Sequence, residues 1–292
     1  MNNLAIRRRP PTQTRRSTNR IGAGRSRGDW RHSVLGCLIL AVMLFPVYWM
    51  VNVSLQPSGA AVGTPWVPLD ISLHGYTTAL ADQSSNLRTS LIVAVGSVVF
   101  SLLIAAPGAY ALARFKVKGA SLVLLGMLVS QMIPGIVVAN ALYGAYNDLG
   151  LLNSIPGLIL ADSTTGIPFA MLVLYTFMKS IPASIVEAAL VDGAGALRAF
   201  ISVVLPISRN ALVTAALFIF LFAWGDFLFA LTLTTTEDVR PVTLGIYNYI
   251  GTYVNDWSSV MATAVLASLP AVVLLVVAQR YIAAGITAGA VK

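Results

Sequence analysis

Long apolar stretches separated by short polar segments dominate the chain. Six of them carry few or no charges, and they cover roughly residues 33–55, 89–113, 120–142, 156–178, 210–231 and 257–278. About 20 apolar residues of helix are needed to cross the hydrocarbon core of a bilayer. Backbone polar groups must be satisfied inside such a segment, and none of the stretches alternates as a barrel strand does. The pattern predicts an all-α membrane protein with six transmembrane helices.

Composition supports a membrane protein and excludes an ordinary soluble domain. Hydrophobic residues make up 57% of the chain and charged residues only 10%, whereas soluble domains have roughly a quarter charged residues. The net charge of +8 could suggest nucleic-acid binding. However, nine of the 19 Lys and Arg lie in the first 32 residues, and the others lie near the ends of apolar stretches. The single cysteine, Cys37, cannot form an internal disulfide.

The distribution of basic residues predicts the orientation. With six spans both termini lie on one side, and that side holds 17 of the 19 Lys and Arg, leaving only Arg88 and Arg240 opposite. The positive-inside rule makes the basic side cytoplasmic. Residues 1–32 are expected to be a basic, disordered cytoplasmic tail, which either orients the first span or contacts anionic lipid. Residues 33–292 are expected to form one six-span domain.

The sequence contains no motif for catalysis or metal binding, and the polar residues within the spans are a thin set for catalysis. It has two histidines, His32 and His74, both outside the predicted spans, and no pattern with metal-ligand spacing. It has no phosphate-binding loop of the GxxxxGK[ST] type. We therefore expect a protein that is not an enzyme and binds neither a metal nor ATP. An intramembrane enzyme is the disfavoured alternative.

The most informative segment is the predicted cytoplasmic loop at residues 179–209. Pro182 ends the preceding helix, and Ser184 followed by Glu187 is a capping-box pattern. The helix that follows is expected to end near Gly193, where glycine allows a turn that a side chain would obstruct. A second helical piece is expected over residues 196–205. The loop is thus predicted to fold as a helix, a turn and a second helix. Its first helix could either dock a partner or be an ordinary surface helix.

The loop resembles the cytoplasmic signature of the membrane subunits of ATP-binding cassette (ABC) importers. The matching residues, at the spacing of that signature, are Glu187, Ala188, Ala189, Gly193, Val203, Leu205 and Pro206. Val203 replaces the usual Ile. The resemblance implies the fold of a type I ABC importer permease, in which the helix near Glu187 is a coupling helix that contacts an ATPase. Leu190 and Asp192 would belong to the same coupling surface.

Residues from about 40 to 292 are similar to one branch of that family, the second permease subunit of maltose-type carbohydrate importers. The similar segments include 45–50 in the first span, 109–115 at the end of the second, and 131–134. The resemblance implies a second homologous permease, an ATPase dimer that uses ATP and Mg²⁺, and an extracytoplasmic solute-binding protein. It also implies the cytoplasmic (inner) membrane of a prokaryote. The C-terminal residues Gly289, Ala290, Val291 and Lys292 would reach the ATPases.

The translocation path is predicted from polar and aromatic residues inside the spans, because such residues usually face a cavity or a partner. Trp224 and Asp226 are the first candidates, since aromatic faces and hydrogen-bonding groups together bind sugars. Each has an alternative role: Trp224 could pack against the partner permease, and Asp226 could pair with a cation from that partner. Weaker candidates, which could be interhelical hydrogen-bonding groups, are Gln131, Asn140, Asp162, Ser163 and Thr164.

The sequence therefore predicts the permease subunit of an ATP-driven carbohydrate importer, which forms the translocation path with a second permease. One alternative is the same machinery importing glycerol 3-phosphate or another polar solute. The absence of a mid-span cation argues mildly against a phosphate ester. A proton-coupled carrier is a more distant alternative. The sequence does not identify the sugar.

Overall fold

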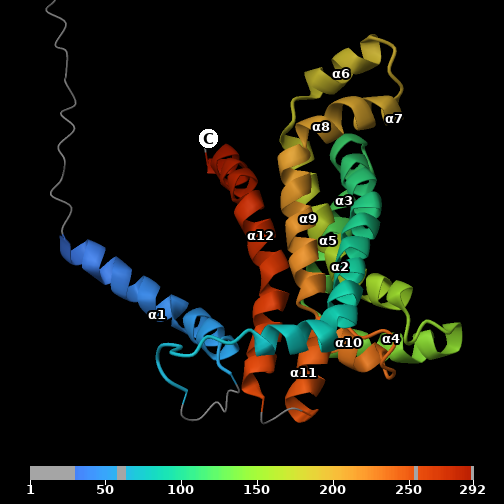
Figure 1. The fold of residues 1–292 in the computed structure, drawn as a ribbon. Helices are drawn as coiled ribbons and strands as arrows, with labels where there is room; N and C mark the ends of the chain where they lie inside the picture. The colour runs from blue at the N-terminus through green and yellow to red at the C-terminus, as the bar shows by residue number, and fades with distance from the viewer. Residues whose placement is uncertain (1–29, 58–63, 253–255, 291–292) are drawn as a thin grey trace, which may run out of the picture. The chain divides into compact units, whose positions relative to one another are not determined.

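The computed structural model describes residues 30–57, 64–252 and 256–290, with side chains at 31, 248–249, 251–252 and 280–290 not described. The described residues form helices joined by short turns, with no strand (Figure 1). The elements are α1 (Trp30–Ser54), α2 (His74–Arg114), α3 (Ala120–Ser130), α4 (Gly135–Leu149), α5 (Ile155–Ser180), α6 (Ala183–Val191), α7 (Ala196–Ala199), the π-helix η1 (Phe200–Val204), α8 (Leu205–Ile207), α9 (Arg209–Trp224), α10 (Leu228–Leu233), α11 (Val242–Thr252) and α12 (Trp257–Ala290).

Four described helices, α1, α2, α5 and α12, are long and apolar enough to cross a membrane. Two sharply bent helix pairs raise the number to six if each pair counts as one span. The first pair is α3 with α4, and the second joins Ala196–Ile207 to Arg209–Trp224 at 77°. Six equals the predicted number of spans, but the second pair includes residues predicted to lie in the cytoplasmic loop. The helices α2 and α12 extend well beyond the predicted spans at 89–113 and 257–278, because their polar or small flanking residues remain helical.

The predicted span at 120–142 is not one helix. It consists of α3 and α4, whose axes differ by 98°. The break lies at residues 131–134, and Pro134 caps α4 with an extended ψ of 131°. Proline has no N–H to continue the α3 ladder and its ring disfavours helix in the preceding residue. By contrast, Pro168 and Pro270 lie inside the continuous helices α5 and α12.

The predicted span at 210–231 is also interrupted. Helix α9 ends at Trp224, and Gly225 to Phe227 separate it from the short helix α10. The backbone N–H groups of Phe229 and Ala230 are satisfied by the carboxylate of Asp226, at 3.3 and 3.1 Å. A polar capping group at the start of α10 thus stabilises a break that the apolar pattern did not predict.

Two compact units divide the chain, Met1–Pro46 and Val47–Lys292. The described part of the first is the N-terminal portion of α1, which is apolar along its length. In the second, α2 packs against α5, α9 and α12, and α5 also packs against α9 (Figure 1).

A stripe of small residues on α2 lets these helices approach closely. Ser97, Ser101, Ala105 and Ala109 recur every fourth residue, and each is fully buried. Opposite them on α5, a Cβ at Gly166 would lie 2.7 Å from the Ser101 hydroxyl. Small residues at i and i+4 are the usual means of close helix packing in membranes. The stripe therefore explains why α2 and α5 form the centre of the unit.

Candidate functional site

The loop between α5 and α9 forms a compact helical unit at one end of the bundle (Figure 1). Helix α6 begins at Ala183, directly after Pro182, and no side chain caps it. Ser184 is therefore already inside the helix, and the predicted capping box with Glu187 does not form. The second predicted helical piece, 196–205, is present as α7, η1 and α8, which together run from Ala196 to Ile207.

Gly193 ends α6 as predicted. Its φ is +83°, in the left-handed region. The N–H of Gly193 bonds to Leu190 O at 3.1 Å, and the N–H of Ala194 bonds to Ala189 O at 3.0 Å. This pair of bonds is the Schellman motif. Among the described residues, apart from its two chain neighbours, no atom lies within 4 Å of a Cβ built at Gly193. Glycine is therefore required by the positive φ and not by lack of space.

Contacts with the core fix the position of the loop relative to the bundle. Val186 of α6, 7% exposed, lies in the same cluster as Phe200 and Val204, and the half-buried Ala189 and Leu205 pack against it. The main cluster also includes residues of α2, α5 and α9. Displacement of α6 would therefore be transmitted to the helices that would cross the membrane, because packed interiors are stiff.

Arg114 provides a polar attachment for the same loop. It is the last residue of α2, and its guanidinium Nη2 donates a hydrogen bond to Ile181 O at 2.6 Å. Ile181 lies between α5 and α6, where the carbonyl groups at the end of α5 need donors. The bond therefore ties the start of the α6 segment to α2.

Several large apolar side chains are exposed on the outer surface of the loop. Val191 is 87% exposed, Leu197 is 71% exposed and Leu190 is 47% exposed. Glu187 and Ala188 are exposed beside them, as are Asp192 and Pro206. Exposed apolar residues clustered in this way mark an interaction surface. We call the exposed residues Glu187, Ala188, Leu190, Val191, Asp192 and Leu197 the α6 surface.

The predicted ATPase-contacting tail cannot be compared with the structure. Gly289 and Ala290 end helix α12 but their side chains lie outside the described residues, and Val291 and Lys292 lie outside them altogether.

A second candidate site is a cavity of about 370 Å³ beside the break between α9 and α10. Residues of α10 line it, and α10 lies toward the end of the bundle opposite α6 (Figure 1). We call it the break cavity, and its lining consists of Asp162, Thr165, Phe222, Gly225, Asp226, Phe227, Leu228 and Phe229.

The two carboxyl groups of the break cavity differ in their surroundings. Both oxygens of Asp226 accept the backbone hydrogen bonds that cap α10. Asp162, on α5, is only 8% exposed, and its carboxylate accepts no hydrogen bond from a described residue. Asp162 was a weaker candidate than Asp226 from the sequence, but among the described residues it is Asp162 whose oxygens accept no hydrogen bond.

The other predicted path residues do not line this cavity. Trp224 is 7% exposed, stacks on Phe220 and donates from Nε1 to Ala267 O at 2.9 Å, so it packs α9 against α12. Gln131 donates to Thr165 O at 3.1 Å, close to the cavity, and Asn140 is exposed on α4. The structure thus brings Gln131 near Asp162 and Asp226 and leaves Trp224 and Asn140 elsewhere.

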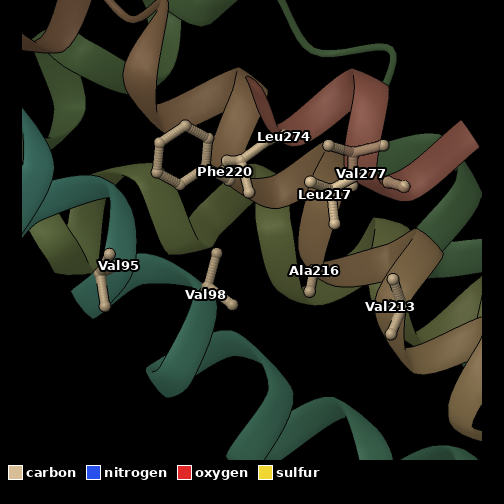
Figure 2. Close-up of a pocket in the computed structure, with 9 residues that line it drawn as sticks. Val95, Val98, Val213, Ala216, Leu217, Phe220, Leu274 and Val277 are labelled. Carbon is tan, nitrogen blue, oxygen red and sulfur yellow. The ribbon is translucent and has the colours of Figure 1, made fainter. Parts of the chain in front are cut away.

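A different, apolar groove lies between α2, α9 and α12 (Figure 2). Its lining residues come from all three helices and are Val95, Val98, Val213, Ala216, Leu217, Phe220, Leu274, Val277 and Ala278. With only aliphatic and aromatic side chains, it offers a polar solute no side-chain hydrogen bond to replace those of water. The break cavity is therefore the better candidate for a solute.

Asp256 directly precedes α12, at the end of the bundle where α10 and α11 lie. Its carboxylate accepts hydrogen bonds from the hydroxyls of Ser258 and Ser259, at 2.6 and 2.5 Å. Burial alone would raise the pKa of Asp256, but these bonds and the nearby positive charge of His74 together hold that pKa below its usual value. No group of three or more His, Cys, Asp or Glu that could hold a metal occurs among the described residues.

Comparison with known proteins agrees with this architecture. Residues 97–288 match the family model of the "binding-protein-dependent transport system inner membrane component". The diacetylchitobiose uptake system permease protein DasC of Streptomyces coelicolor is 33% identical over 264 residues, 89% of this chain and 96% of that protein. The trehalose transport system permease protein SugB of Mycobacterium tuberculosis is also 33% identical over 264 residues, with the same two coverages.

A solved structure has the same fold. It is the crystal structure of a bacterial ABC transporter involved in the import of the acidic polysaccharide alginate, with a TM-score of 0.74 and 25% sequence identity. The match covers 88% of this chain and 98% of that one. The predicted fold class, an all-α permease of the type I ABC importer kind, is thereby confirmed. The chain belongs to the family of inner membrane components of binding-protein-dependent transport systems.

Proposed function

We propose that this chain is a permease subunit of an ATP-driven importer of carbohydrates, either mono-, di- or oligosaccharides. The observation that carries the proposal is similarity over nearly the full length to permeases named for diacetylchitobiose, trehalose, and trehalose/maltose. Partial matches could reflect a shared fold alone. Coverage of 95–96% of these relatives favours shared machinery.

The α6 surface supports a separate ATPase as the source of energy. It combines exposed apolar residues with a stiff connection to the core through Val186 and Arg114. A partner that moves α6 would thus move the bundle. In this proposal the ATPase dimer hydrolyses ATP with Mg²⁺, a second permease completes the path, and an extracytoplasmic solute-binding protein delivers the sugar. The α6 surface faces the cytoplasm, as do both termini.

The experiment is transport by the complete complex in proteoliposomes. The second permease, the ATPase subunits and the binding protein are co-reconstituted with this chain, and uptake of trehalose, maltose and diacetylchitobiose is measured. We expect uptake of at least one sugar that needs both ATP and the binding protein and survives an uncoupler. Uptake that an uncoupler abolishes and ATP does not affect would identify a proton-coupled carrier and contradict the proposal. Uptake of glycerol 3-phosphate in place of every sugar would contradict the carbohydrate assignment alone.

A further inference from the structure

The break cavity has a feature that capping and packing do not explain. Asp162 is 8% exposed, lies about 10 Å along α5 from its start at Ile155, and accepts no hydrogen bond from the described residues. A carboxylate at such depth is costly unless donors or a counter-charge compensate it. Asp226 cannot supply donors as a carboxylate, because an ionised carboxylate only accepts hydrogen bonds, as its two backbone contacts show. An ionised Asp162 therefore needs donors from outside the described part of the chain.

The cavity around Asp162 has the size and lining of a small-molecule site. Its volume of about 370 Å³ falls within the range of roughly 300–1,000 Å³ that is typical of ligand pockets. Phe222, 44% exposed, lines it together with Phe227 and Phe229. Aromatic side chains and a carboxylate acceptor together suit a ligand with apolar C–H faces and several hydroxyl donors.

The charge of the lining also selects among such ligands. Two carboxyl groups line the cavity, and no Lys, Arg or His is among its lining residues. An anionic ligand would be repelled at this site, because opposing like charges in a low-dielectric environment is unfavourable. A neutral hydroxyl-rich or amine-bearing ligand would instead donate to Asp162.

We propose that the break cavity is a sugar subsite in which the Asp162 carboxylate accepts hydrogen bonds from hydroxyl or ammonium groups, so that neutral and basic sugars pass and acidic sugars are disfavoured. The inference rests on the proposed carbohydrate function and names the substrate class within it. Thr165 lies one helical turn from Asp162 and lines the same cavity, so it can report on the charge there.

The first test needs no knowledge of the sugar. Cys37 is the only cysteine, so Thr165→Cys in a Cys37→Ser background gives a single reporter thiol in the intact complex. Its reaction rates with a cationic and an anionic methanethiosulfonate reagent are compared, with Leu149→Cys, 71% exposed, as the reference thiol. We expect the cation-to-anion rate ratio at position 165 to fall at least about threefold when Asp162→Asn is added. The matched control Asp148→Asn, an exposed carboxyl on α4, should leave the ratio unchanged.

Three results would overturn the inference. The thiol at position 165 could fail to react with either reagent in every nucleotide state, which would show that the cavity is not part of an aqueous path. The rate ratio could be unaffected by Asp162→Asn. Asp162→Asn could instead release the second permease during purification, which would make Asp162 an interface residue paired with a partner cation.

The second test uses the transport assay and separates this inference from the proposed function. Trehalose, maltose, diacetylchitobiose and an alginate trisaccharide are the probes. Uptake of a neutral sugar supports the carbohydrate function whatever Asp162 does. The subsite predicts that Asp162→Asn raises the KM for that sugar about tenfold or more, whereas Asp148→Asn, at the exposed carboxyl on α4, does not. An unchanged KM, or preferred uptake of the alginate trisaccharide by the wild type, would refute the subsite. Uptake of none of the four would reject both proposals.

Discussion

Replacement of Gly193 tests whether the turn after α6 must hold its left-handed conformation. At φ +83° the residue completes a Schellman motif, and a Cβ there would meet no atom within 4 Å from the described residues beyond its chain neighbours. Substitution therefore introduces no clash within the chain, and its cost is conformational. We consider Gly193→Asn, Gly193→Ala and Gly193→Val, with Gly195→Ala as a matched control. Gly195 has an ordinary φ of −68° and also lacks neighbours within 4 Å of its Cβ.

The magnitude follows from the backbone. A residue with a Cβ costs about 1–2 kcal/mol in the left-handed region, and Asn is tolerated better than Ala, whereas β-branched residues are tolerated least. If docking to the ATPase requires this turn, 1–2 kcal/mol corresponds to a loss of roughly 5–30-fold in the population of the competent state. Uptake should therefore decrease in the order glycine, Asn, Ala, Val, while Gly195→Ala transports normally.

The assay is ATP-driven uptake by the reconstituted complex, measured together with the amount of assembled complex and its basal ATPase rate. Equal losses for all three Gly193 variants would refute the conformational argument, because they would show that any side chain collides with the partner. Full uptake in Gly193→Val, with normal assembly, would refute a role for the turn itself.

Three further variants test other contacts. Arg114→Ala should lower uptake by up to about tenfold, because it removes the hydrogen bond to the Ile181 carbonyl. Arg114→Lys should lower uptake less. Uptake at the wild-type rate in both variants would show that this hydrogen bond does not position the loop. Gly157→Ala should destabilise the permease by about 1–3 kcal/mol in thermal unfolding, because its Cβ would lie 2.3 Å from Leu151 O, whereas Gly144→Ala, with no atom within 4 Å, should stabilise it by about 0.5–1 kcal/mol. The pKa of Asp256 is lower in the folded state than in the unfolded state, so its carboxylate stabilises the fold at pH values above the ordinary Asp pKa of roughly 3.9. This stabilisation is lost as the pH falls through the lower folded-state pKa, so the difference in melting temperature between wild type and Asp256→Asn should narrow toward acid pH. A difference that does not change with pH would contradict this prediction.

Much of the fold could be predicted because lipid imposes strong constraints on sequence. The apolar stretches at 33–55 and 156–178 correspond closely to α1 and α5. Gly193 ends α6 where a glycine after a helical pattern was expected. The two broken spans were less predictable, since hydropathy averages over Pro134 and Gly225 and does not register which backbone groups lose their partners.

Side-chain surroundings could not be predicted from a single apolar pattern. Trp224 and Asp226 are two residues apart, yet the indole packs against α12 and the carboxylate caps α10. Asp162 faces a cavity lined by Gly225 to Phe229, where α9 and α10 are interrupted, and this juxtaposition depends on contacts distant in sequence. One missed signal was readable: Ser97, Ser101, Ala105 and Ala109, four residues apart, mark the buried face of α2.

Disulfide or bifunctional cross-linking from the α6 surface tests the central claim most directly. Val191→Cys in the Cys37→Ser background places one thiol at the most exposed apolar position of that surface. Leu149→Cys places one at the last residue of α4, a helix at the opposite end of the bundle from α6 (Figure 1). In the intact complex we predict a covalent product of this chain with the ATPase subunit from position 191 and none from position 149. Failure to capture the ATPase from any position of the α6 surface, in a complex that still transports, would contradict the account.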